Sequence, residues 1–150
     1  MTDRFEHFTL SIFSISRFWN RLATEEMKKY GFRGAYALYL VMIASADGNM
    51  TAAALADLCQ RDKADVSRAI SAFRKKGILE PYGESRYRAA LKLTEKGQSL
   101  AAAIRSRADE VLEQAGRGIS DEMRENMYLC LDIIARNMRQ ICDGETDTSA

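Results

Sequence analysis

Apolar positions recur every three or four residues along most of the chain, and this spacing predicts a mainly helical protein. A long first helix is expected over 5–30, with a heptad-like apolar seam and Gly31 as its C-cap. The segment 35–46 is almost wholly apolar, so it predicts a helix buried inside the domain. Two long helices should start at the capping residues Thr94 and Ser120, separated by Gly116 and Gly118.

Between these long helices, two short ones are predicted with a tight turn. The first follows the cap Thr51, and its inner face should hold Leu55, Leu58 and Cys59. The second covers 62–76, with Asp62 as its cap and Asp65 at the capping-box position. Its apolar stripe is formed by Val66, Ala69, Ile70 and Phe73. This pair has the form of a helix-turn-helix, in which the second helix enters the DNA major groove.

A hairpin, or wing, is predicted directly after the second short helix. Two apolar runs, 78–80 and 89–93, flank a turn-rich tip that carries Arg86 and Arg88.

The order and spacing of four segments resemble the MarR family of bacterial transcription regulators. The segments are T-x-x-x-L-A, D-K-A-D-V-S-R, K-K-G-I-L-E and L-T-E-K-G, set among long helices before and after them. This resemblance implies an obligate homodimer on a pseudo-palindromic operator, often released by a small-molecule or oxidant signal. Family wings usually carry an Asp before two basic residues, whereas Ser85, Arg86 and Tyr87 stand here. A pairing of Glu84 with Arg86 or Arg88 is expected to take the place of that Asp–Arg contact.

The expected fold is therefore one winged helix-turn-helix domain over 1–150, with about six helices and a two- or three-stranded β wing. Segments 5–30 and 94–142 are expected to be dimerisation helices, 35–93 the winged-helix DNA-binding lobe, and 143–150 a disordered tail. A length of 150 residues with 47% hydrophobic composition suits a single domain.

Charge is distributed unevenly along the chain. The formal net charge is only +1, but the segment 61–92 holds nine basic and four acidic residues. A basic segment in an otherwise acidic chain is typical of a nucleic-acid face, although many charged helix faces are simply solvated. The residues predicted to bind DNA are Thr51, Lys63, Ala64, Asp65, Ser67, Arg68, Ser71, Arg74, Lys75, Arg86 and Arg88. Those from 63 to 68 should reach base edges, and the later arginines and Lys75 should hold phosphate or the minor groove.

The first and last helices are too apolar to be covered within one chain of this length, so they predict the dimer interface. The residues expected there are Phe5, Phe8, Ile12, Met127, Ile134, Met138 and Ile141. Phe13, Phe18 and Trp19 could alternatively line an aromatic ligand cleft, but core and dimer packing is the simpler interpretation.

Neither a catalytic constellation nor a cofactor or metal motif is recognisable, so a non-enzymatic protein is expected. The single histidine, His7, has no partner that the sequence places beside it. No signal-peptide pattern or membrane-length apolar run is present, which predicts a cytoplasmic protein. Cys59 and Cys130 lie on apolar stripes and should be buried, and Cys142 near a helix end should react slowly. A small apolar or aromatic effector is therefore expected rather than thiol oxidation.

Two functions remain open from the sequence. The first is a dimeric, sequence-specific DNA-binding regulator, expected to be a repressor. The second keeps the same fold but has weak or lost DNA binding, which leaves a dimeric ligand-binding or protein-interaction module. A salt-dependent DNA shift assay separates the two.

Overall fold

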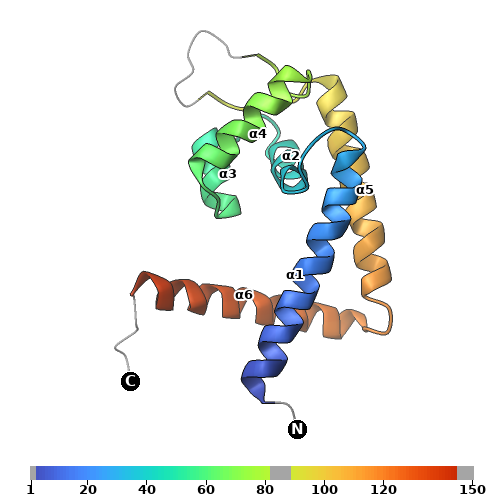
Figure 1. Ribbon diagram of the computed structural model, residues 1–150, viewed down its shortest axis with the longest axis vertical. Helices are drawn as coiled ribbons and strands as arrows, with labels where there is room; N and C mark the ends of the chain where they lie inside the picture. Colours follow the sequence, from blue (N-terminus) through green and yellow to red (C-terminus); the bar gives the residue numbers. More distant parts are fainter. Residues whose placement is uncertain (1–2, 82–88, 145–150) are drawn as a thin grey trace. The chain divides into compact units, whose positions relative to one another are not determined.

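The computed structural model describes residues 3–81 and 89–144, in two compact units, Met1–Ala108 and Asp109–Ala150. The described residues form six α-helices (Figure 1). They are α1 (Arg4–Lys28), α2 (Tyr36–Ser45), α3 (Ala52–Cys59), α4 (Lys63–Lys75), α5 (Glu95–Ala115) and α6 (Asp121–Asp143). The mainly helical class and the approximate positions of all six helices are as predicted. No helix in the described part of the chain is long and apolar enough to cross a membrane.

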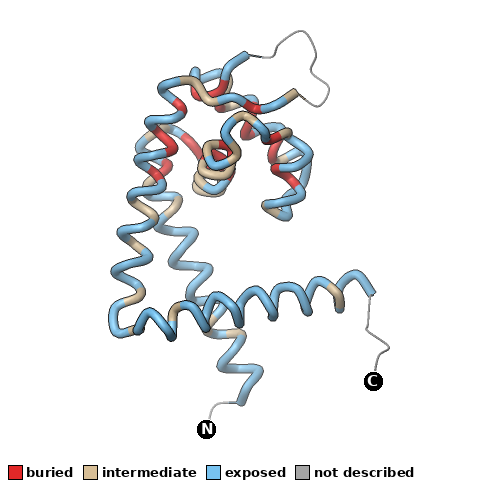
Figure 2. Tube along the Cα trace, turned by 180° about the vertical axis from the view of Figure 1, so that it is seen from behind, coloured by how far each residue is buried: buried red, intermediate tan, exposed pale blue. Residues whose placement is uncertain are grey.

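The core of the first unit is built around α4. Its stripe of Val66, Ala69, Ile70 and Phe73 is fully buried, as predicted. This stripe packs on α2 and α3, and the Phe73 ring meets that of Phe32 edge to face with centroids 5.2 Å apart. Figure 2 shows that buried residues are concentrated in α2 to α4 and the nearby ends of their neighbours, while α6 has none.

Local capping explains where most helices begin and end. The side chains of Thr51, Thr94 and Ser120 accept hydrogen bonds from backbone amides at the starts of α3, α5 and α6, so all three predicted caps are confirmed. The turn between α3 and α4 is tight because Gln60 adopts a left-handed conformation with φ of 52°. Asp62 is different, since its side chain makes no capping hydrogen bond at the start of α4.

The wing is less regular than predicted. Outside the helices, the described residues contain only two isolated antiparallel bridges, Leu79 with Leu93 and Thr51 with Ala90, and no extended strand. The Glu80 amide also donates to the Lys92 carbonyl at 2.8 Å, so the two runs pair at their base. Residues 82–88, which include the predicted tip, lie outside the described residues. The prediction of a regular β wing is therefore corrected to a bridged hairpin base.

Several burial predictions were wrong, because helical periodicity does not determine which side of a helix another element packs against. In α2 the buried residues include Tyr36 and Tyr39, whereas Leu38 is exposed. In α3 Leu58 is 54% exposed and Ala56 is buried instead. Cys130, on the predicted apolar stripe of α6, is also exposed.

The second unit joins the end of α5 to α6. The Arg124 guanidinium of α6 pairs with the Glu113 carboxylate of α5 at 3.3 Å. Gly118, with φ of 89°, turns the chain between the two helices, as the sequence indicated. α6 contains no buried residue, so its apolar stripe is left open.

A close approach of two backbones constrains the junction of the hairpin and α5. Gly97 is buried, and a Cβ added there would collide with the Ile78 carbonyl oxygen. We expect Gly97→Ala to lower the free energy of unfolding by about 1–3 kcal/mol, since backbone atoms must move to admit the methyl group. Urea denaturation measures this, with the exposed Ser99→Ala as the matched control. Equal midpoints for the two variants would contradict the close approach.

Candidate nucleic-acid interface

The face of α4 opposite its buried stripe is exposed and polar. Of the residues predicted to bind DNA, six lie open to solvent along this helix. They are Lys63, Ala64, Ser67, Arg68, Ser71 and Lys75. Because the side chains at the first two turns are short or flexible, the N-terminal half of α4 offers a slender, basic surface of the kind that fits a major groove.

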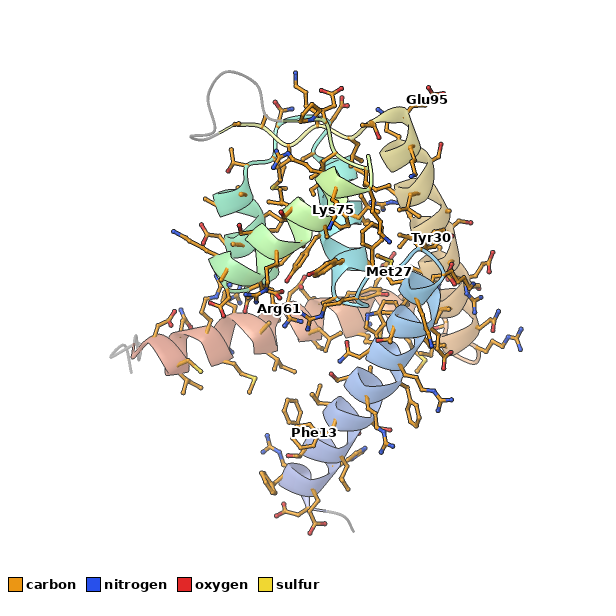
Figure 3. The ribbon with its side chains drawn as sticks, turned by 45° about the horizontal axis from the view of Figure 1, so that its top comes forward. Phe13, Met27, Tyr30, Arg61, Lys75 and Glu95 are labelled. Carbon is orange, nitrogen blue, oxygen red and sulfur yellow. The ribbon has the colours of Figure 1, made fainter. Side chains whose placement is uncertain are left out.

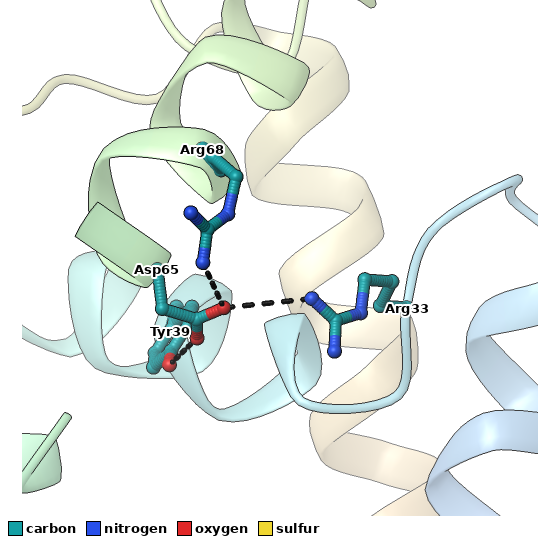
Figure 4. A network of polar contacts seen from close by, with 4 residues as sticks. All are labelled: Arg33, Tyr39, Asp65 and Arg68. Carbon is teal, nitrogen blue, oxygen red and sulfur yellow. Dashed lines mark hydrogen bonds and ion pairs between the residues drawn. The ribbon is translucent and has the colours of Figure 1, made fainter. Parts of the chain in front are cut away.

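Asp65 has a different environment from its neighbours on this face. Its side chain is only 17% exposed and accepts a 2.6 Å hydrogen bond at Oδ2 from the Tyr39 hydroxyl of α2. Two guanidinium groups, those of Arg33 and Arg68, lie at 3.5 Å from its other oxygen, Oδ1 (Figure 4). Both carboxylate oxygens are therefore engaged within the chain. The base contact predicted for Asp65 stays a prediction, and the observed contacts tie its carboxylate to neighbouring side chains.

The protonation states of this network follow from its geometry. The hydrogen bond from Tyr39, and then the charges of Arg33 and Arg68, lower the pKa of Asp65 despite partial desolvation. Burial and the adjacent Asp65 carboxylate raise the pKa of Tyr39 from 10.0 to about 12. At neutral pH the tyrosine thus remains a donor and the carboxylate remains ionised.

Arg33 was not identified by the sequence patterns. It lies in the loop between α1 and α2, 32 positions before Asp65 along the chain, and its side chain is 67% exposed. Helical periodicity gives no information on loop residues. The available signal was Tyr39, because a tyrosine buried in an apolar helix needs a hydrogen-bond partner for its hydroxyl.

Three other basic or polar residues have structural partners. Arg74 is half-buried, and its Nε donates to the Glu80 carbonyl at 3.1 Å. Lys76 donates to the Tyr30 carbonyl at 3.1 Å and lies 4.9 Å from the centroid of the Phe32 ring. Thr51 is half-buried as the cap of α3. The predicted contacts of Arg86 and Arg88 lie outside the described residues.

Figure 3 shows the side chains of the described residues on the ribbon. Arg61 lies at the turn before α4 and Lys75 at its other end, while Met27 and Phe13 occupy different parts of α1. Met27 is buried in the core, whereas Phe13 is exposed. The residues predicted for the dimer interface are all exposed: Phe5, Phe8, Ile12, Met127, Ile134, Met138 and Ile141. Cys59 is half-buried, and this burial raises its thiol pKa, with Arg61 partly opposing the effect.

Removal of one hydroxyl group tests the network. We expect Tyr39→Phe to lower the free energy of unfolding at pH 7 by about 1.5–3 kcal/mol, the range for hydrogen bonds to charged groups. Because the pKa of Tyr39 is raised to about 12, its stabilising contribution is complete below pH 10 and is lost as the pH rises towards 12. The lowered pKa of Asp65 means that its contribution is lost only as the pH falls below 3.8.

Denaturant unfolding of wild-type and variant across this range measures the difference. Tyr36→Phe is the matched control, because Tyr36 is also buried in α2 and its hydroxyl makes no hydrogen bond among the described residues. If the difference in free energy of unfolding between wild type and Tyr39→Phe stayed constant from pH 7 to 12, the hydrogen bond from Tyr39 to Asp65 would not be its cause.

Comparisons with known proteins show similarity at the level of the fold. No family model matches the chain, and no curated protein matches its sequence. A MarR transcriptional regulator from Methanosarcina mazei Go1 is 23% identical, with 94% of each chain covered and a TM-score of 0.79. A MarR protein from Peptoclostridium difficile is 17% identical, with 93% of this chain and 92% of that chain covered and a TM-score of 0.80.

The structure of Staphylococcus aureus MepR in complex with DNA is also similar. It is 19% identical, with 87% of this chain and 96% of that chain covered and a TM-score of 0.76. Identities this low establish a shared fold. The chain therefore has the mainly helical fold of the MarR-family transcriptional regulators over most of its length.

Proposed function

We propose that the chain is a sequence-specific DNA-binding transcriptional regulator, a repressor that acts in the cytoplasm as a homodimer on a pseudo-palindromic operator. The observation that carries this proposal is the exposed face of α4. Its opposite stripe is fully buried, so the helix is held in one rotational setting with the polar and basic residues outward. A helix fixed in this way presents the same side chains to each DNA site.

The chemistry of that face suits DNA readout. Lys63, Ser67 and Arg68 lie on the first two turns of α4, where a recognition helix meets base edges. An arginine there can donate two hydrogen bonds to guanine, and a serine hydroxyl can pair with several bases. Lys75, at the far end of the helix, suits a phosphate contact.

Known proteins of the same fold support this assignment. MepR is a transcription regulator of the Staphylococcus aureus multidrug efflux pump MepA, and its structure was determined with DNA. The present chain shares that fold, and its α3 and α4 have the lengths and tight turn of a helix-turn-helix. The proposed regulator acts by binding DNA and has no enzymatic role.

The homodimer is supported by two apolar surfaces. Met27 is the buried residue of α1, and α6 has none, although both helices carry rows of large apolar side chains. Exposed apolar rows of this extent are characteristic of surfaces that meet another subunit. We assign Phe5, Phe8 and Ile12 of α1, with the α6 stripe, to the dimer interface.

A small-molecule effector is the proposed signal. A cavity of about 930 Å³ within the first unit is lined by residues of α2, the hairpin base and α5. Ile43, Leu93 and Ala101 provide apolar surface, and Lys92 and Arg105 provide positive charge. This size is within the range of small-molecule sites. It supports an effector with an apolar body. The half-buried Cys59 does not favour thiol oxidation, whereas Cys130 and Cys142 are exposed.

The DNA contact of Arg68 is the first test of this function. With duplexes selected from a random library, we expect Arg68→Ala to weaken binding by roughly 1–3 kcal/mol, because a charge-assisted contact is lost. Fluorescence anisotropy measures the change. Arg21→Ala is the control, since Arg21 is also exposed and paired with a carboxylate, that of Glu25.

Unchanged affinity in a folded Arg68→Ala protein would remove α4 from the DNA interface. A wild-type chain without measurable affinity for any selected duplex would instead indicate the non-DNA-binding ligand or interaction module.

Assembly is tested on α6. Ile134→Asp places a charge on the apolar stripe, and we expect it to dissociate or unfold the dimer, since a buried unpaired charge costs several kcal/mol. Analytical ultracentrifugation measures the mass of the wild-type chain and of the variant. Arg136→Gln changes the net charge by the same one unit at an exposed position on the opposite face of the helix, and this control should stay dimeric. A wild-type monomer would rule out the proposed assembly.

A further inference from the structure

We propose that Arg33, in the loop between α1 and α2, is a second DNA-contacting arginine beside Arg68, and that Asp65 is the positioning residue for both. This inference rests on the proposed DNA-binding function and adds a phosphate contact from outside the helix-turn-helix. Its basis is the convergence of two arginines on one carboxylate oxygen at the start of α4.

The geometry brings two positive charges together on the side of α4 assigned to DNA. Arg33 Nη1 and Arg68 Nη2 each lie 3.5 Å from Asp65 Oδ1 (Figure 4). One carboxylate between two guanidinium groups leaves the cluster with a net positive charge. The first turn of α4 adds the partial positive charge of a helix N-terminus, so the cluster attracts an anion such as a DNA phosphate.

Arg33 is available for such a contact. Its side chain is 67% exposed, and that of Arg68 is 63% exposed. Among the described residues, the Arg33 guanidinium contacts the Asp65 oxygen and the face of the Tyr36 ring, whose centroid is 5.9 Å away. A guanidinium has five N–H donors, so most of them remain free for phosphate oxygens. The ring and the carboxylate restrict the orientation of the group before DNA binds.

Asp65 cannot be explained as a favourable charge for DNA, because a carboxylate at this position repels phosphate. It is nevertheless well anchored, since the hydroxyl of the buried Tyr39 donates to it at 2.6 Å. The hydrogen bond and the two arginines also lower its pKa, which keeps it ionised at neutral pH. The fixed Asp65 carboxylate accepts from both arginines and so limits the motion of their side chains. Less side-chain conformational entropy is then lost when the arginines bind DNA.

The alternative is that the cluster only ties the α1–α2 loop to α4. A tie of this kind affects the stability of the fold but makes no contact with phosphate. It therefore predicts no change in the salt dependence of DNA binding when Arg33 is replaced. The two interpretations are separated by variants that differ in charge and position.

The first experiment replaces Arg33 with glutamine and measures affinity for a selected duplex and a scrambled duplex from low to high salt. Each lost phosphate contact should reduce the slope of log K against log salt by about 0.9, hence about two units for a dimer. Affinity should fall severalfold on both duplexes. The control is Arg21→Gln, which removes the same charge from a comparably exposed arginine in α1 that is also paired with a carboxylate. A slope for Arg33→Gln equal to that of the control would overturn the contact.

The second experiment asks whether removal of a negative charge near the start of α4 strengthens or weakens DNA binding. Asp65→Asn and Asp62→Asn each remove one negative charge near the start of α4, but the Asp62 side chain makes no capping hydrogen bond there. If only net charge matters, both variants should bind DNA more tightly than wild type. Positioning predicts that Asp65→Asn binds the selected duplex more weakly than wild type, while Asp62→Asn does not. Tyr39→Phe, which keeps the Asp65 charge, should shift binding in the same direction as Asp65→Asn.

The outcomes distinguish this inference from the proposed function. If the wild-type chain binds selected DNA and Arg68→Ala weakens it, the function stands whatever Arg33 does. An unaltered salt slope in Arg33→Gln, or tighter selected-duplex binding by a folded Asp65→Asn, would then overturn the second contact or the positioning role alone. If no duplex is bound, both proposals fail together.

Discussion

The burial of one stripe of α4 is the interaction on which the rest of the first unit depends. Val66, Ala69, Ile70 and Phe73 are removed from water together, and each large apolar side chain contributes about 1.5–3 kcal/mol when fully buried. The Phe73 ring is enclosed by the rings of Phe32 and Tyr36 at centroid distances of 5.2 and 5.8 Å. With this face fixed, rotation of α4 about its axis is prevented, and the basic face has a defined direction.

Polar contacts then set the details of that basic face. The core supplies Tyr39, whose buried hydroxyl must find an acceptor, and Asp65 provides it from the first turns of α4. The carboxylate in turn reaches Arg33 and Arg68, so the core is connected to the surface through a single side chain. Elsewhere, Lys76 donates a hydrogen bond to the Tyr30 carbonyl, just after the end of α1. Among the described basic residues of the segment 61–92, Arg74 and Lys76 thus bond backbone carbonyls of the fold, whereas Lys63 and Lys75 lie open to solvent.

The long helices α1 and α6 differ from α4, because most of their apolar side chains are exposed. α6 carries an apolar stripe from Met123 to Ile141 but has no buried residue, and most of α1 is equally exposed. Such helices are unstable in isolation, because tertiary packing supplies most of the stability of an amphipathic helix in water. In the proposed homodimer, a second subunit would supply that packing. Two units linked through α5 would then depend on assembly as well as on their own cores.

Periodicity determined the helices, because a repeat of three to four residues is a local property that burial then selects. It located all six helices, the buried stripe of α4, and the caps Thr51, Thr94 and Ser120. The exposed basic face of α4 followed from the same repeat. The sequence resemblance to MarR regulators also pointed to the fold that known structures share with this chain.

Contacts between distant segments could not be predicted in this way, because they depend on how helices pack and not on spacing within one helix. The tertiary structure alone decided that Leu38 and Leu58 face outward and that Tyr39 is buried. It showed that the Asp65 carboxylate contacts Arg33, which lies 32 positions away along the chain. The pairing of a loop arginine with a helix carboxylate has no periodic signature, so it becomes visible only once α2 and α4 are packed together.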